Sequence, residues 1–339
     1  MTRIPQSLLL ALPLLPAGAR AATALPLSYV QTFGTAGDPV TRLGWGLAVI
    51  SIVVFALVTI ALLAGLLRRR PPVPEFELAV RRDAGGMSWL YVGVSITVVV
   101  LAACAVWTML TLRAIAMPGA ADQMKLHVTG AQWWWRVEYQ ASDPSRGFTT
   151  ANEIHIPVGQ PVKVELSSED VIHSFWVPQL SGKIDMIPGH TNELWLQASQ
   201  PGTYRGQCGE FCGAQHAHMA MLVVAQRPED FATWRDRQLQ PAAAPAPGSP
   251  GENAERLFVS RCGACHTVRG TDAGGILGPD LTHLMERSTV AAGALPNTPG
   301  NLAAWISNPQ SIKPGTRMPA PSITPAELQQ VVAYLQTLR

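Results

Sequence analysis

The chain has 339 residues and a formal net charge of +2, a length typical of two or three domains. Charged residues make up 14% of the chain, below the roughly one quarter that is usual in soluble proteins, and the mean hydropathy is slightly positive. We therefore expect part of the chain to lie in a membrane. The small net charge, without a dense Lys/Arg stripe, argues against a nucleic-acid-binding protein.

Residues 1–22 predict a secretory signal peptide that is cleaved near Ala21 or Ala22. An early arginine precedes a short apolar run, and small residues follow that run. The alternative is an uncleaved membrane anchor. The apolar run is too short to span a bilayer, and Pro13 and Pro16 interrupt it.

Two long apolar runs, residues 41–67 and 89–113, predict transmembrane helices, because each exceeds the roughly 20 residues that cross a hydrocarbon core. The loop between them, residues 68–88, is rich in arginine and is expected in the cytoplasm by the positive-inside rule. Everything after the second run then lies outside the cytoplasm, which agrees with the signal peptide.

Residues 123–226 contain short apolar–polar alternations bounded by Gly, Pro and Asn. Val162, Val164 and Leu166, for example, alternate with charged residues. Period-two alternation with turn residues at this spacing predicts an antiparallel β-sandwich or barrel.

A Pro/Ala-rich linker, residues 240–251, separates this β-domain from a small helical domain, residues 252–339. We expect the linker to let the helical domain swing while keeping it at high local concentration. Thr324 and Glu327 predict a capping box at the start of the last helix.

The stretch "YRGQCGEFCGAQHAHMAM" brings Cys208, Cys212, His216 and Met219 into one loop, and His173 lies earlier, at the end of a predicted strand. Two cysteines four apart in an exported domain suit a disulfide, and zinc binds cysteine and histidine. A thioether beside two thiolates and two imidazoles favours copper instead, because soft sulfur ligands with a weak axial methionine are typical of copper.

Two thiolates can bridge two metals, so that each metal receives both sulfurs and one histidine. The weak ligands would then be Met219 on one side and a backbone carbonyl, such as that of Glu210, on the other. Such a site suits electron transfer, because shared sulfurs spread the unpaired electron and the geometry changes little on reduction. It does not suit substrate chemistry.

The stretches "SSEDVIHSFWVP", "GKIDMIPG", "QCGEFCGAQHAHM" and "GAQWWWRVEY", together with the paired apolar runs, resemble cytochrome c oxidase subunit II over about residues 43–225. The resemblance implies a cupredoxin-like barrel held outside the membrane by a two-helix hairpin. It also implies a binuclear copper centre, CuA, whose ligands would be His173, Cys208, Glu210 through its carbonyl, Cys212, His216 and Met219. In that family the Glu210 position also lends its carboxylate to a magnesium ion shared with the catalytic subunit.

Three consecutive tryptophans, Trp133 to Trp135, belong to one apolar stretch. Alternation along a strand would put Trp134 on the opposite face from its neighbours. Aromatic residues in strands usually pack in the core, and we expect this of Trp135. The resemblance assigns to Trp133, the first tryptophan after Gly-x-Gln, an exposed position where electrons reach the copper centre.

In the helical domain, "RCGACHTV" places Cys262, Cys265 and His266 in the Cys-x-x-Cys-His pattern that attaches haem c. The two thiols form thioethers with haem, and His266 is left to bind the iron. A thioredoxin-like redox pair is the alternative, but it needs a βαβ context that this helical segment lacks.

The second axial ligand is predicted to be Met318. Its loop, "GTRMPA", resembles the methionine loop of class I cytochromes c, whereas Met285 is expected to pack. "GPDL" also resembles that family, which implies that the Pro279 carbonyl accepts a hydrogen bond from His266. The tail is therefore expected to be a small all-α cytochrome c domain.

A copper pair and haem c in one chain resemble subunit II of caa-type oxidases. The predicted protein is subunit II of a haem–copper cytochrome c oxidase in the bacterial cytoplasmic membrane, with both metal domains on the periplasmic side. It would take electrons from cytochrome c or an upstream respiratory complex through haem c and CuA. It would pass them to the oxygen-reducing subunit I, with subunit III as a further partner, in respiration coupled to proton translocation.

Two alternatives remain open from the sequence. The chain could be a stand-alone membrane-anchored electron carrier, or the copper subunit of another terminal reductase such as nitric oxide reductase. One departure from the resembling family stands near Met87, where many members have a glutamate at the entrance of a proton path. This chain has "AGGMSW" there, and Glu75, Glu77 and Asp83 are the nearby carboxylates.

Overall fold

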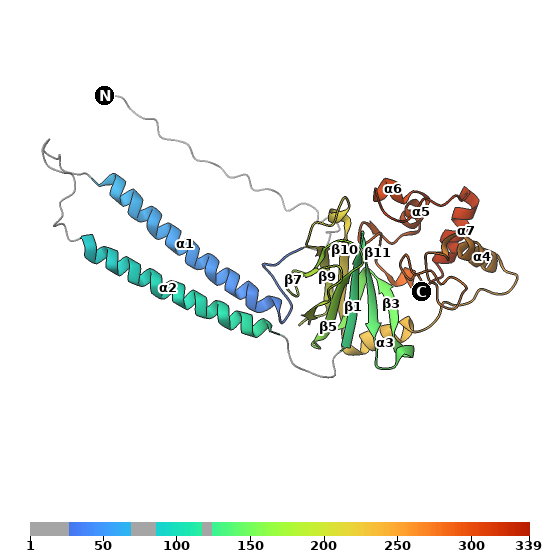
Figure 1. The fold of residues 1–339 in the computed structure, drawn as a ribbon, viewed down its shortest axis with the longest axis horizontal. Coiled ribbons are helices and arrows are strands. Elements are labelled where there is room, and N and C mark those ends of the chain that lie inside the picture. Colours follow the sequence, from blue (N-terminus) through green and yellow to red (C-terminus); the bar gives the residue numbers. More distant parts are fainter. Residues whose placement is uncertain (1–26, 69–85, 117–123) are drawn as a thin grey trace, which may run out of the picture.

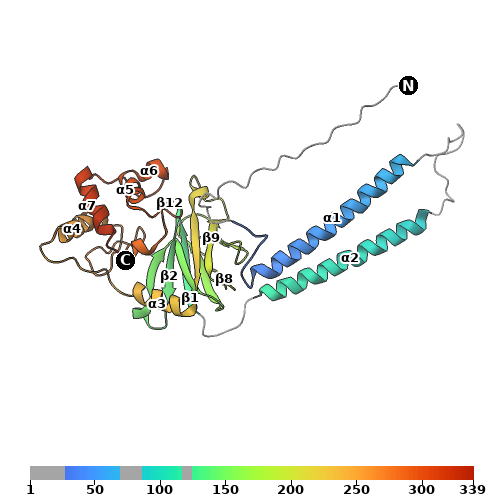
Figure 2. The same cartoon turned by 180° about the vertical axis from the view of Figure 1, so that it is seen from behind.

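The computed structural model describes residues 27–68, 86–116 and 124–339. The predicted signal peptide and most of the predicted cytoplasmic loop lie outside these residues. The described chain forms a helical hairpin, a two-sheet β-domain and a small helical domain, which follow one another along the long axis of the molecule (Figures 1 and 2). The predicted fold class is confirmed.

The hairpin consists of α1 (Gly37–Leu67) and α2 (Gly86–Ile115), which lie side by side (Figure 1). Gly46 lets the helices approach closely, since a Cβ there would lie 2.2 Å from Cη2 of Trp107. Both helices are long and apolar enough to cross a membrane, and their large apolar side chains are exposed. A surface of this kind is stable against lipid rather than water.

Ten strands build the β-domain in two five-stranded sheets, ordered β3-β2-β1-β5-β8 and β4-β10-β9-β6-β7. The strands are β1 (Met124–Ala131), β2 (Trp134–Gln140), β3 (Phe148–Ala151), β4 (Glu153–Pro157), β5 (Val162–Ser168), β6 (His173–Trp176), β7 (Lys183–Met186), β8 (Asn192–Leu196), β9 (Gly202–Cys208) and β10 (Ala220–Gln226). Helix α3 (Pro228–Gln238) closes one end through Phe231 and Trp234.

The predicted all-antiparallel pairing is wrong at two places, because β1 pairs with β5 and β10 pairs with β4 in parallel. A hairpin can only join antiparallel neighbours, whereas a chain that leaves one sheet and returns can align parallel strands. Here β4 belongs to the second sheet and lies between β3 and β5 in sequence, so β5 returns to the first sheet beside β1.

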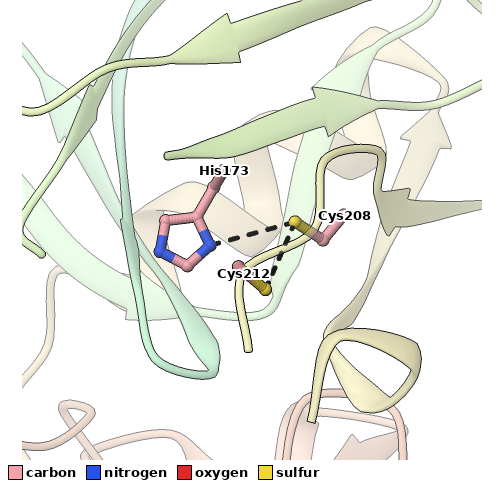
Figure 3. Close-up of side chains that lie close together, drawn as sticks. All are labelled: His173, Cys208 and Cys212. Atoms are coloured by element: carbon pink, nitrogen blue, oxygen red, sulfur yellow. Dashed lines mark hydrogen bonds between the residues drawn. The ribbon is translucent and has the colours of Figure 1, made fainter. Parts of the chain in front are cut away.

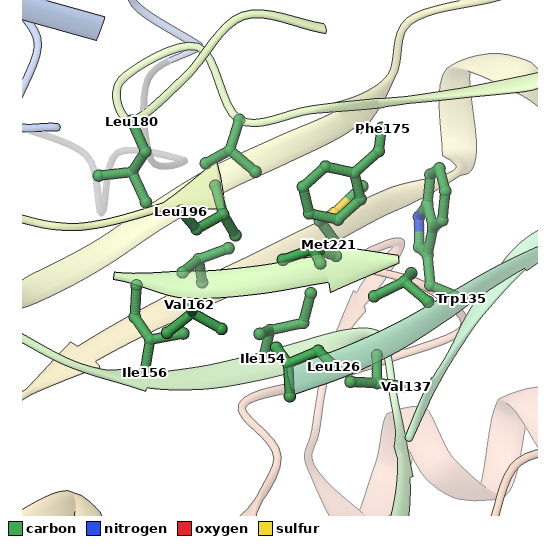
Figure 4. Close-up of a cluster of buried hydrophobic side chains, with 14 of the residues drawn as sticks. Leu126, Trp135, Val137, Ile154, Ile156, Val162, Phe175, Leu180, Leu196 and Met221 are labelled. Atoms are coloured by element: carbon green, nitrogen blue, oxygen red, sulfur yellow. The ribbon is translucent and has the colours of Figure 1, made fainter. Parts of the chain in front are cut away.

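The alternating side chains of the two sheets meet in one core. Leu126, Trp135, Ile154, Val162 and Phe175 are fully buried in it (Figure 4). The Trp135 and Phe175 rings meet edge to face with their centroids 6.0 Å apart, a favourable aromatic geometry. This core lies directly behind the predicted copper ligands, since the Trp135 ring also meets the His173 ring edge-on at 6.1 Å.

The helical domain contains α4 (Pro250–Cys262), α5 (Pro299–Ser307), α6 (Pro309–Ile312) and α7 (Pro325–Leu335), with a short pair of strands, β11 (Thr289–Val290) and β12 (Leu295–Pro296). Helices α4 and α7 pack together through Phe258 and Tyr334, whose ring centroids are 5.3 Å apart. The predicted capping box of Thr324 and Glu327 is confirmed. Part of the predicted linker lies on this domain, where the Ala242 N–H donates to the Arg269 carbonyl.

Candidate copper and haem sites

The sheet register brings the predicted copper ligands together. His173 begins β6 and Cys208 ends β9, and these strands pair antiparallel so that Phe175 lies opposite Cys208. The chain then loops through Cys212 and a short 3-10 turn, His216–His218, before β10. Two strand ends and one loop therefore converge at one end of the second sheet (Figure 3).

The ligand atoms gather around two sulfur atoms. Cys208 Sγ lies 3.8 Å from Cys212 Sγ and 3.8 Å from His173 Nδ1. Cys212 Sγ lies 3.6 Å from His216 Nδ1 and 3.8 Å from Met219 Sδ. Each sulfur thus has its own histidine, and Met219 is fully buried beside Cys212.

Glu210 faces the same cluster with its backbone. Its carbonyl oxygen lies 3.2 Å from Cys208 Sγ, whereas Met219 lies beside Cys212 Sγ. Its carboxylate points elsewhere, is largely exposed, and lies 3.7 Å from Lys183 Nζ. The carbonyl and the carboxylate of one residue can therefore serve two different neighbours.

The donor set fits a metal pair better than a disulfide. A disulfide needs sulfurs about 2.05 Å apart, whereas these are separated by 3.8 Å. Metal–thiolate bonds are about 2.3 Å long, so metals on either side of the sulfur pair could bind both sulfurs. Two thiolates, two imidazoles, a thioether and a carbonyl form a soft, mixed set of the kind that selects copper.

Electrostatics within the cluster favour a shared negative charge. The Cys212 thiol and, less strongly, the nearby hydrogen-bonding groups hold the pKa of Cys208 well below its usual range, while the resulting thiolate raises the pKa of Cys212. Two adjacent sulfurs thus share one charge in the absence of a cation, and a cation is needed for both to ionise.

Asp170 orients His173 and was not predicted as a site residue. Its carboxylate accepts from His173 Nε2 at 2.9 Å, which leaves Nδ1 facing Cys208. Burial alone would lower the pKa of His173, but hydrogen bonds to Cys208 and Asp170 outweigh it and raise that pKa. The quoted "SSEDVIHSFWVP" contains this aspartate, three residues before His173, but spacing alone did not reveal the contact.

Trp133 is buried, with 7% of its surface exposed, so the expected exposed position is wrong. Its indole Nε1–H donates to the Cys212 carbonyl at 2.9 Å. This bond connects the ring directly to residues 209–219, which we call the copper loop. The helical domain covers the ring, since a methyl group at Gly315 would lie 3.3 Å from Trp133 Cη2. Trp135 belongs to the core, as expected.

The Cys-x-x-Cys-His motif follows α4. Cys262 is the last residue of that helix, and Cys265 and His266 lie in the turn beyond it. His266 Nδ1 lies 2.8 Å from the Pro279 carbonyl, so the expected orienting contact is confirmed. Burial lowers the pKa of His266, which favours a neutral imidazole with Nε2 free to bind a metal.

Met318 lies in the loop between α6 and α7 and packs partly against the core of the helical domain. Met285 packs against the same core, and its N–H donates to the Leu338 carbonyl. Axial ligation by Met318 stays a prediction. The Cys-x-x-Cys-His motif, the oriented histidine and a methionine on a loop of the same domain form a donor set that suits haem c.

Comparison with known proteins agrees with both sites. The families described as "Cytochrome C oxidase subunit II, periplasmic domain" and "Cytochrome c" match residues 141–226 and 251–339. The chain is 35% identical over 296 residues to cytochrome c oxidase subunit 2 of Alkalihalophilus pseudofirmus, which covers 86% of this chain and 84% of that protein. The chain belongs to the cytochrome c oxidase subunit 2 family.

Two further members of this family illustrate its range. Cytochrome c oxidase subunit 2 of Bacillus sp. (strain PS3) is 30% identical and covers 72% of each chain. The crystal structure of the periplasmic domain of subunit II of cytochrome oxidase from Bradyrhizobium japonicum is 33% identical, covers 36% of this chain and 96% of that one, and has a TM-score of 0.33.

Membership in the cytochrome c oxidase subunit 2 family confirms the predicted function over the two alternatives. The chain is subunit II of a cytochrome c oxidase, with a copper-binding domain fused to a cytochrome c domain that implies haem c. Its partner is a terminal oxidase, and its two membrane-capable helices fit a membrane-anchored subunit. We call residues 124–238 the copper domain and residues 250–339 the haem domain below.

Proposed function

We propose that this subunit II collects single electrons at a covalently attached haem c and relays them, through a binuclear CuA centre, to the oxygen-reducing subunit I. The observation that carries the proposal is the convergence of two thiols, two imidazoles, a thioether and a carbonyl around sulfurs 3.8 Å apart. When bound, the copper pair and the haem each supply one-electron exchange with little change in geometry.

In the copper domain, His173, Cys208, Cys212, His216 and Met219 would hold the copper pair together with the Glu210 carbonyl. The cluster is buried behind Trp135 and Phe175, which exclude water and keep the ligands in place when the charge changes. Trp133, bonded to the Cys212 carbonyl, is the proposed contact through which electrons reach this site.

In the haem domain, Cys262 and Cys265 would form the thioether links, and His266 and Met318 would hold the iron. The Pro279 carbonyl holds the His266 ring through Nδ1 and fixes its orientation.

The proposal also covers the location of the protein and its partners. We place the protein in the bacterial cytoplasmic membrane, spanned by residues 41–67 and 89–113, with both metal domains in the periplasm. Subunits I and III are the proposed partners, and cytochrome c or an upstream respiratory complex is the proposed donor. The exposed carboxylate of Glu210 is available for a magnesium ion shared with subunit I.

The test uses the full chain matured with haem and copper, and three cysteine variants. We expect Cys208→Ser to lose the near-infrared copper absorption and the copper electron paramagnetic resonance signal while it keeps covalent haem. We expect Cys262→Ser to disrupt covalent haem attachment while copper remains, and Cys104→Ser, in α2, to change neither. Zinc in place of copper, or a Cys208–Cys212 disulfide in the matured protein, would overturn the proposal.

A further inference from the structure

A single lysine is buried where the haem domain meets the copper domain. Lys313 is 2% exposed although it lies on the loop that leads to Met318. Its Nζ donates three hydrogen bonds: to the Trp133 carbonyl at 2.7 Å, the His218 carbonyl at 2.9 Å and the Ala291 carbonyl at 3.1 Å. Two of these three acceptors belong to the copper domain.

The three acceptors match the chemistry of an ammonium group, which has three N–H donors and no acceptor. Burial lowers the pKa of Lys313 to about 7, which reflects the cost of removing the charge from water. The carbonyls offset that cost while the domains are in contact. If the domains separated, Lys313 would lose the Trp133 and His218 carbonyls.

The residues that follow Lys313 strengthen the same contact. The Gln215 side chain, in the copper loop, donates to the Pro314 carbonyl at 2.9 Å. The Arg317 guanidinium lies 3.0 Å from the Asp170 carboxylate, which also holds His173. The loop from Lys313 to Met318 is thus bonded to the residues immediately around the predicted copper ligands.

Two more contacts join the domains, one beside the Lys313 acceptors and one at Ser288. The Ala220 N–H, at the start of β10, donates to the Ala292 carbonyl at 3.0 Å. Ser288 donates to the Glu153 carboxylate through its N–H at 3.0 Å and its hydroxyl at 2.7 Å. Contacts at two separate places, around Lys313 and at Ser288, favour one relative orientation over a loose association.

We propose that Lys313 is a positioning residue that locks the haem domain onto the copper domain above Trp133, so that the tethered domain occupies the face through which a soluble donor would approach the copper site. The lock follows from the contacts alone, and its meaning for electron transfer rests on the proposed function. The expected flexible swing of the linker is then restricted to excursions from one docked position.

Hydrogen–deuterium exchange of the matured full chain in detergent tests the lock. The variant is Lys313→Met, which removes the charge at similar length. The control is Arg256→Met, since Arg256 is exposed on α4 and pairs with Glu252 of its own helix. Truncating one partner of a buried charged contact weakens binding about a hundredfold. We expect exchange at residues 131–135, 213–220 and 310–318 to accelerate at least about tenfold in Lys313→Met and to stay unchanged in Arg256→Met.

Protection of α4 and α7 in the same experiment reports whether the haem domain itself stays folded. Should Lys313→Met unfold it, Arg317→Gln provides a milder variant, for which we expect faster exchange in the same three segments alone. If residues 131–135, 213–220 and 310–318 kept wild-type protection in Lys313→Met, with α4 and α7 intact, the lock would be overturned.

A second readout separates positioning from folding. After rapid photoreduction of the haem domain, we expect transfer to copper to be independent of added sucrose in the wild type. In Lys313→Met it should be about tenfold slower and should slow further with viscosity, because docking must precede each transfer. Equal rates and equal viscosity dependence would contradict the proposal. Absence of copper from the wild type would instead contradict the proposed function and leave the exchange result standing.

Discussion

The copper domain and the haem domain each make room with a glycine for a histidine that is predicted to bind a metal. A Cβ at Gly130 would lie 2.9 Å from Cδ2 of His173, and a Cβ at Gly278 would lie 2.6 Å from Cε1 of His266. Both distances are shorter than side chains tolerate, so each ring occupies space that any other residue would fill. In both of these unrelated folds, a glycine leaves the space that a histidine ring needs.

The two domains differ in what holds the rest of the site. In the copper domain the ligand atoms contact one another, and His173 is held by the carboxylate of Asp170. In the haem domain His266 is held by a backbone carbonyl, and Met318 lies on a loop more than fifty positions away in sequence. The predicted copper ligands are therefore brought together by the sheet register, whereas the predicted haem ligands lie on segments far apart in the sequence.

Large-to-small substitutions in the two cores give the largest expected effects. Trp135→Ala should reduce the free energy of unfolding of the copper domain by about 3–5 kcal/mol, because it removes a fully buried indole behind His173. Phe258→Ala should cost the haem domain a similar amount by opening the α4–α7 contact. Calorimetry should show one transition shifted in each variant. A common shift of both transitions would mean that the domains unfold as one unit.

The glycine at the copper site gives a smaller, local effect. Gly130→Ala should displace the His173 ring, lower copper occupancy and destabilise the copper domain by about 1–3 kcal/mol through overpacking. Gly182→Ala is the matched control, because a Cβ there meets nothing within 4 Å. Metal analysis and thermal melting of both variants provide the measurement, and normal copper content in Gly130→Ala would contradict the steric argument.

The glycine at the haem site offers the parallel experiment. Gly278→Ala should push His266 away from the iron position and destabilise the haem domain by about 1–3 kcal/mol. The readout is the low-spin haem spectrum, with Gly274→Ala as control, since a Cβ at Gly274 is also unobstructed. If only one of Gly130→Ala and Gly278→Ala disturbed its metal site, the two glycines would not have the same role.

Acid should weaken the contact between the domains by an amount comparable to the effect of the glycine substitutions. Burial alone would raise the pKa of Glu153, but hydrogen bonds from His155 and Ser288 outweigh it and lower that pKa below 4.5. Only the Ser288 part of this lowering depends on the domain contact. Through that part the charged carboxylate stabilises the contact fully above about pH 4.5, and the contribution is lost as the pH falls through the lowered pKa.

Neutron scattering with contrast-matched detergent measures this separation of the domains. Glu153→Gln should weaken the contact by about 1.5–3 kcal/mol at neutral pH and should remove this component of the acid response. Glu229→Gln, at an exposed position on α3, should behave like the wild type. An unchanged acid response in Glu153→Gln would assign the effect to another group.

The smallest expected effect concerns the last helix. Thr324→Ala removes the side chain that accepts from the Glu327 N–H and should cost the haem domain about 1 kcal/mol. Thr289→Ala, in β11, is a matched control in the same domain outside the cap. Thermal melting should show the lower stability in the haem domain alone, and a shift in the copper domain would show coupling through the contact.

Much of the fold could be predicted because its signals are local. The two apolar runs, the strand alternation and the α7 cap each depend on side chains within a few positions of one another. Strand pairing could not be predicted in the same way. The parallel β1–β5 and β4–β10 pairs depend on which sheet each strand joins, and that choice depends on the packing of the whole β-domain.

The sequence by itself determined the chemistry of both sites, because thiols, imidazoles and thioethers at these spacings are properties of residue type and order. The tertiary structure alone decided what surrounds them. Asp170 became the partner of His173 only through the geometry of the loop before β6. Lys313 resembles an ordinary surface lysine in the sequence. It is buried because docking adds the carbonyls of residues 133 and 218 to that of residue 291 around one ammonium group. A contact between groups so far apart in the chain leaves no local pattern, since it exists only when the two domains meet.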